Sequence, residues 1–205
     1  SLDESALGRQ FMAWLSQGML NGTLSVNEPE ALVHVVAEGL LLASPRIFRE
    51  FAKQRVGVPE SAADAAKRVQ REVLREGWHL RADRGVNILC YERKRSDRGS
   101  SRINGIVIRE PQRFIQALPA IDSALVRVVV SGDASRLHLE VVDDGRGQFR
   151  VYDISARKEL AQLQAPAGSV VQGARLSEAQ ATVVLELLDP GADRTQRSLH
   201  AYRYR

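Results

Sequence analysis

The end of the chain, from about Ala124 onward, consists of short strand-like segments separated by turns, and this pattern limits the fold more than any other. The strand-like segments are ALVRVVVSG, RLHLEVV, QFRVYDI, ATVVLELL and SLHAYRYR. The turn sequences GDAS, DDGRG and DPGADR lie among them. A spacing of roughly 8–12 residues is typical of antiparallel β structure. We therefore expect residues 122–205 to form a small all-β domain, an antiparallel sandwich or barrel of unknown role.

The preceding part alternates between helical and extended patterns. A first helix is predicted over Glu4–Asn21 and a hairpin around Ala37–Gly39. Ser44 is predicted to cap a second helix, with Pro45 in its first turn. A third helix is predicted from Pro59 to Gly77, and strands are predicted near 78–81, 88–95 and 103–108.

This order of elements is close to that of a winged helix, a helix-turn-helix variant whose final hairpin is the wing. In that fold the third helix would be the recognition helix. The predicted class is therefore α+β, with a winged-helix-like domain over 1–121 followed by the small β-rich domain over 122–205.

The positive charge is concentrated in the first part of the chain. Residues 1–120 carry 18 Lys and Arg against 14 Asp and Glu, whereas residues 121–205 carry 11 of each. No apolar run approaches the ~20 residues of a membrane-spanning helix, and no signal peptide is recognisable. By elimination we expect a cytoplasmic protein. Because the chain begins SLDES without Met, we expect a piece of a longer protein.

The third predicted helix has a basic side opposite an apolar side. The apolar side would pack into the domain and turn the basic side outward, as binding to phosphates requires. The basic residues are Lys67, Arg68, Arg71 and Arg75, and the apolar ones are Ala62, Ala65, Ala66, Val69 and Val73. The alternative is an ordinary solvated face, in which Glu72 is placed to pair with Arg68.

The second basic segment is the predicted wing. Its cations, with Asp97 as the one acid in 93–102, are Arg93, Lys94, Arg95, Arg98 and Arg102. A tip of Gly and Ser with no Asn or Gln suits contacts with the DNA backbone better than base readout. The alternative is an edge hairpin that its charges keep soluble.

Catalytic motifs are not apparent in the sequence. The four histidines, His34, His79, His138 and His200, lie in strand-like runs without metal-ligand spacing, so structural or surface roles are expected. Asp143–Asp144 fits a hairpin turn more simply than a cation site. Cys90 is the one cysteine, and we expect a buried structural thiol. We predict no catalytic residue, no metal and no cofactor.

The segment Phe11–Ala52 carries a resemblance to a known family. The residues concerned are Trp14–Leu15, Gly22, Leu24, Asn27, Val33–His34, Gly39, Ser44–Pro45, Ile47 and Phe48, followed downstream by NILCYERK, INGIVI and Leu118–Pro119. Over about residues 5–120 the chain resembles the C-terminal domain of TraI-type relaxases, also described as helicases, of the MobH class of integrative conjugative elements. The β-rich part lies outside the resemblance.

The resemblance implies a winged-helix-like fold and a role in conjugative DNA transfer. It also implies that the nicking chemistry lies in a separate N-terminal, HD-hydrolase-like region, which nothing in this chain matches. We therefore predict a non-catalytic DNA-binding accessory domain that binds duplex or single-stranded DNA, with other relaxosome proteins as further partners and no membrane contact. A protein-interaction module of the conjugation machinery is the main alternative, and a metal-dependent nuclease using Asp143 and Asp144 is a third.

Overall fold

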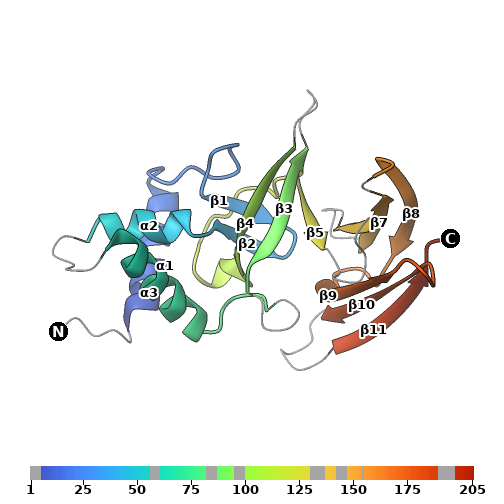
Figure 1. Cartoon of the computed structure of the whole chain (residues 1–205). Helices are drawn as coiled ribbons and strands as arrows, with labels where there is room; N and C mark the ends of the chain where they lie inside the picture. The colour runs from blue at the N-terminus through green and yellow to red at the C-terminus, as the bar shows by residue number, and fades with distance from the viewer. Residues whose placement is uncertain are drawn as a thin grey trace. The chain divides into compact units, whose positions relative to one another are not determined.

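The computed structural model describes residues 6–55, 61–81, 87–94, 100–129, 137–141, 147–153, 155–188 and 197–205 (Figure 1). The chain forms two compact units, each built from two stretches of sequence. Unit 1 comprises Ser1–Leu80 and Asn104–Asp122, and unit 2 comprises Arg81–Ile103 and Ser123–Arg205. Residues 81–103 thus belong to unit 2, whereas the predicted domains are continuous; the domains 1–121 and 122–205 stay a prediction.

The helices of unit 1 are α1 (Leu7–Leu20), α2 (Arg46–Lys53) and α3 (Ala62–Arg75), which lie together beside β1 and β2 in Figure 1. Aromatic side chains join α1 to α2. The Phe11 ring lies 5.0 Å from that of Phe48 and 5.4 Å from that of Phe51, measured between centroids. Both Phe11 and Phe48 are fully buried. Such tilted and edge-on pairs stabilise a core beyond the area they bury.

The strands of unit 1 are β1 (Val33–Val36), β2 (Gly39–Ala43) and the second half of β4 (Ser100–Ile108). All pairs are antiparallel, with Val33 opposite Leu42 and Leu40 opposite Ile108. Every residue of β2 is buried, because β2 lies between β1 and β4. A short 3-10 helix, η3 (Pro111–Arg113), follows β4.

Unit 2 consists of strands. Its first set, in antiparallel order, is β3 (Leu89–Lys94), β5 (Leu125–Val129), β6 (Leu137–Val141), β7 (Gln148–Asp153) and β8 (Lys158–Gln164). A three-stranded sheet follows, made of β9 (Val170–Ser177), β10 (Thr182–Leu188) and β11 (Arg197–Arg203), with β10 in the middle.

One hydrophobic core joins the two sheets of unit 2. Leu139 and Phe149 from the first sheet share it with Val183 and Leu185 from the second. Buried Arg127 adds a polar link, because its guanidinium donates to the carbonyl of Val171 in β9. These strands therefore form the two-layered, antiparallel structure expected for the β-rich part.

The α+β class is confirmed, with three α-helices and antiparallel sheets among the described residues. The order of helices and hairpins also agrees with the prediction, but a winged-helix arrangement is not confirmed. Two strands, β8 and β9, were not predicted. The predicted strand at 78–81 is reduced to a single bridge between His79 and Ile108.

Helix α1 begins at Leu7, and the predicted start at Glu4 lies outside the described residues. Two other local predictions about the helices need correction. Ser44 does not cap α2: the N-cap is Pro45, and the Ser44 hydroxyl donates to Gln70 Oε1 at 2.7 Å instead. Ala62 is exposed, because it lies in the first turn of α3, before the helix meets its neighbours. Within the described residues no helix has the length and apolar character to cross a membrane.

We predict that Gly39→Ala destabilises unit 1 by about 3 kcal/mol or more. Gly39 has φ +148°, and a Cβ there would collide with the carbonyl oxygen of Ile108. Gly22→Ala is the matched control, because Gly22 has φ +76° but nothing near its Cβ; only conformational strain, about 1 kcal/mol, is expected. Urea unfolding followed by tryptophan fluorescence reports on unit 1, since Trp14 and Trp78 both lie there. Equal losses in the two variants would contradict the collision.

Candidate nucleic-acid interface

The helix α3 begins at a well-formed cap. The Ser61 hydroxyl accepts a hydrogen bond from the Asp64 backbone N–H at 3.2 Å, satisfying a donor in the first turn. The buried side of α3 consists of Ala65, Ala66, Val69 and Val73. These short side chains let the helix backbone pack closely against α1 and α2.

The opposite side of α3 carries the predicted cations. Lys67, Arg71 and Arg75 are exposed and lie four residues apart, so they form one stripe along the helix. The stripe is about 12 Å long at 1.5 Å per residue. Arg68 is half-buried at its edge. Within unit 1, the fold therefore presents three of the four predicted cations of this helix to solvent.

The charge of Arg75 is partly offset. Its Nη1 lies 2.7 Å from Glu72 Oε1. The Arg75 side chain is 66% exposed and that of Glu72 only 12%, so a guanidinium edge still faces water. An exposed pair of this kind contributes little to stability. Glu72, considered above as a partner for Arg68, is thus bound to Arg75.

The hairpin of β3 and β4 presents fewer of its predicted cations. Arg93 is buried, with 7% of its surface exposed, and this corrects its prediction as a surface contact. The reason is strand alternation: Leu89, Tyr91 and Arg93 all point to one buried face. Arg102 in β4 is exposed. The side chain of Lys94 and the residues Arg95 and Arg98 lie outside the described part.

Cys90 reports on the electrostatics of this hairpin. Its side chain is half-buried, not fully buried as predicted. Burial raises the pKa of the Cys90 thiol, the Arg102 charge lowers it, and the Glu92 charge raises it. The thiol is therefore protonated at neutral pH and a poor nucleophile. The opposing effect of Arg102 shows that its positive charge lies close enough to favour the Cys90 thiolate.

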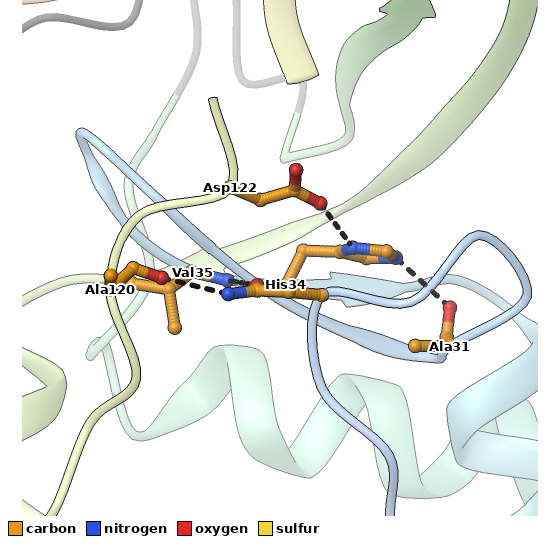
Figure 2. Close-up of polar contacts among 6 residues, drawn as sticks. Ala31, His34, Val35, Ala120 and Asp122 are labelled. Atoms are coloured by element: carbon orange, nitrogen blue, oxygen red, sulfur yellow. Dashed lines mark hydrogen bonds and ion pairs between the residues drawn. The ribbon is translucent and has the colours of Figure 1, made fainter. Parts of the chain in front are cut away.

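A buried polar cluster joins β1 to the end of unit 1 (Figure 2). His34 Nδ1 lies 3.2 Å from Asp122 Oδ2, and His34 Nε2 lies 3.0 Å from the Ala31 carbonyl oxygen. A carbonyl oxygen only accepts, so Nε2 carries the hydrogen of that bond. The contact between Nδ1 and Asp122 then requires one more proton, on either the imidazole or the carboxyl group. His34 is fully buried, so this proton stabilises a contact that is shielded from water.

Asn27 extends this cluster through its side-chain amide. Its Nδ2 donates to the Ala120 carbonyl at 2.7 Å, and its Oδ1 accepts from the Val35 N–H at 2.8 Å. The Asp122 N–H donates to the Val35 carbonyl at 2.8 Å. Asn27 has φ +64°, a conformation that Asn adopts more readily than most residues. We call Asn27, His34 and Asp122 with these contacts the β1 clip.

The remaining candidates for chemistry lack a catalytic arrangement in the described part of the chain. His79 is buried, and His200 is half-buried with its ring stacked on Tyr202. The side chain of His138 and the pair Asp143–Asp144 lie outside the described residues. Among those that are described, no three His, Cys, Asp or Glu side chains gather as a metal site would require.

One feature of unit 1 was missed by the sequence predictions. An open groove of about 540 Å³ is lined by Arg9, Met12, Ala13, Ser16, Gln17, Trp78, Arg113 and Phe114. The lining comes from three separate segments, so no local motif marks it. The available signals were Trp78 directly after a helix-ending glycine and Arg113 beside Phe114.

The comparison with protein families is decisive for the first part of the chain. A family model described as "conjugal transfer nickase/helicase TraI C-term" matches residues 6–127, more than half of the chain. The chain belongs to this family. The match confirms the resemblance seen in Phe11–Ala52 and extends from α1 into the first half of β5.

Other comparisons add little about this TraI C-terminal family member. The crystal structure of the C-terminal domain of a Salmonella enterica protein is similar, with 21% identity over 60% of this chain and 98% of that one, and a TM-score of 0.48. A likeness at this level says nothing about function. No curated protein matches the chain.

Several residues that carry the family likeness have structural roles in unit 1. Asn27 and His34 form the β1 clip with Asp122. Gly39 lies against the Ile108 carbonyl. In this TraI C-terminal domain, these residues of the family likeness therefore make contacts that stabilise the fold. The charged residues of α3 are not among the residues that carry the likeness.

We predict that His34→Leu and Asp122→Leu each destabilise unit 1 by about 3 kcal/mol or more, because each leaves a buried polar partner without its contact. The double variant should lose clearly less than the sum of the two, since it removes both partners together. Urea unfolding of the two single variants and the double variant, followed by tryptophan fluorescence, measures the coupling. Additive losses would show that His34 and Asp122 do not stabilise each other.

Proposed function

We propose that this chain is a non-catalytic DNA-binding accessory domain of a conjugative relaxase. The observation that carries the proposal is the exposed stripe of Lys67, Arg71 and Arg75, held outward by the buried alanine and valine side of α3. The membership of the TraI C-terminal family supplies the setting of conjugal DNA transfer. In a winged-helix arrangement, α3 would be the recognition helix.

The side chains of the stripe favour contacts with phosphates over contacts with bases. Lys and Arg neutralise phosphate charge and release counterions, which supplies most sequence-independent affinity. The stripe carries no Asn or Gln, the residues that read adenine in the major groove. Its three cations can each neutralise one phosphate of the DNA backbone. We therefore propose that the stripe binds the phosphate backbone of DNA with little preference for sequence.

The hairpin of β3 and β4 contributes less in this proposal than its sequence alone predicts. Arg102 is exposed and is the described cation available for a phosphate. Arg93 is buried and is removed from the proposed contacts. Lys94, Arg95 and Arg98 stay predicted contacts.

The non-catalytic part of the proposal has its own test. Purified protein should not nick supercoiled plasmid with Mg²⁺ or Mn²⁺, because a nuclease of this kind needs a cluster of carboxylates around its metal. Nicking that disappears in Asp143→Asn/Asp144→Asn would replace the proposal with a metal-dependent nuclease.

A second candidate function is a protein-interaction module, and β11 favours it. Among the described strands of the three-stranded sheet, β11 pairs with β10 on one side and forms an edge. Leu199, in the middle of β11, is 75% exposed. An exposed edge strand can accept a strand from another protein, with side chains such as Leu199 adding apolar contact.

We predict that DNA affinity falls steeply with salt and depends on the α3 stripe. Lys67→Glu/Arg71→Glu should weaken binding by about tenfold or more, and reduce the slope of log affinity against log salt by about 2. Arg175→Glu/Arg203→Glu is the matched control, with the same charge change on exposed positions of unit 2. Gel shifts with duplex and single-stranded DNA at several salt concentrations measure the affinity and its salt dependence. If the two double variants weaken DNA binding equally, the α3 stripe is not the binding surface. If Leu199→Lys leaves DNA affinity unchanged but abolishes binding of a relaxosome protein, the protein-interaction module is favoured.

We predict that Arg102→Ala raises the pKa of the Cys90 thiol further. The Arg102 charge lowers that pKa, so its removal leaves burial and Glu92 unopposed. The pH at which iodoacetamide alkylation of Cys90 becomes fast should therefore rise. Bound DNA should shift the profile in the same direction in the wild type, because a phosphate neutralises Arg102, and should have no such effect in Arg102→Ala. A profile unchanged by saturating DNA would remove Arg102 from the proposed contacts.

A further inference from the structure

The groove in unit 1 is lined by cations and aromatic rings. Arg9, Ala13 and Ser16 share the side of α1 that borders it, and Trp78, Arg113 and Phe114 border it from two other segments. Arg9 and Arg113 are both exposed. Among the described residues that line it, none is acidic. The groove is therefore complementary to a negatively charged ligand with apolar faces.

The aromatic rings are fixed relative to each other. The Trp78 and Phe114 centroids lie 4.8 Å apart at 56°, and both rings are half-buried. The Ser16 hydroxyl donates to the Phe114 carbonyl at 3.1 Å, which ties this residue to α1. Such rings need little reordering when a flat ligand stacks on them.

The two cations remain available at the rim. The Arg113 guanidinium lies 5.9 Å from the Phe114 ring centroid and 3.4 Å, Nη1 to Oε2, from Glu110. The side chains of Arg113 and Glu110 are 58% and 59% exposed, so their pair is open to water and easily exchanged for another anion.

We propose that this groove binds a nucleotide of single-stranded DNA, with its base on Trp78 and Phe114 and its phosphate between Arg9 and Arg113. Basic grooves with aromatic side chains bind single strands in this way, because every base has a face that can stack. A duplex keeps its bases stacked on each other, so it can offer only phosphates here. An acidic protein segment fits the cations but gives the two rings no flat partner. The inference rests on the proposed function as a DNA-binding domain and adds a site separate from the α3 stripe.

Trp78 itself provides the measurement. Trp14→Phe leaves Trp78 as the one tryptophan. Trp14 lies outside the groove lining and meets the Phe51 ring edge-on, a contact that phenylalanine can retain. In this background, an oligothymidylate of about 12 nucleotides should quench Trp78 emission saturably, and a duplex of the same length should not.

Charge-reversal variants test whether the quenching depends on the cations that line the groove. Arg9→Glu and Arg113→Glu should each weaken the quenching by about fivefold or more. Arg49→Glu, an exposed position of α2 outside the groove, is the control and should leave it unchanged. Far-ultraviolet circular dichroism verifies that each variant is folded.

The outcomes distinguish this site from the proposed function. If a labelled oligonucleotide gains anisotropy on binding while Trp78 emission stays constant, the protein binds DNA elsewhere and the groove assignment is wrong. If neither duplex nor single strand binds at low salt, both proposals fail. A response to polyglutamate with none to the oligonucleotide would overturn the assignment in favour of an acidic protein segment.

Discussion

The contact between His34 and Asp122 joins the two separate stretches of sequence that make up unit 1. It places a proton-sharing pair in a site from which water is excluded, and buried polar groups are stable only when each finds a partner. Asn27 meets the same requirement for the backbone of Ala120 and Val35. Together these contacts fix the last residues of unit 1 against β1. The strand β1, held in this way, is the neighbour that pairs with the fully buried strand β2.

Much of unit 1 could be predicted because its signals are local. The periodicity of α3 placed Ala65, Val69 and Val73 inside and Lys67 and Arg71 outside, as the structure has them. An ordered run of residues within Phe11–Ala52 indicates the family, and the family model matches the same part of the chain. In contrast, the β1 clip joins residues 88 positions apart, and no spacing rule connects them.

The errors have physical causes that residue type alone does not reveal. The charges from Arg93 to Arg102 predict one cationic surface, but strand alternation turns Arg93 inward with Tyr91. The pattern does not predict strand β8, because its Lys, Glu and Ala residues are uncommon in strands. In β9, Gly173 interrupts the apolar pattern, and pairing with β10 supplies the order that the sequence lacks.

The two-part composition of unit 1 has a consequence for the order in which the protein can fold during synthesis. The strand β2 needs β4, and His34 needs Asp122, yet residues 81–103 of unit 2 come between. The N-terminal helices therefore leave the ribosome long before the segments that complete their unit. Contacts so distant in sequence slow folding, because a long loop must close before they form. A fragment that ends before residue 122 would lack the carboxylate of the clip, so a boundary for expressing unit 1 alone belongs beyond it.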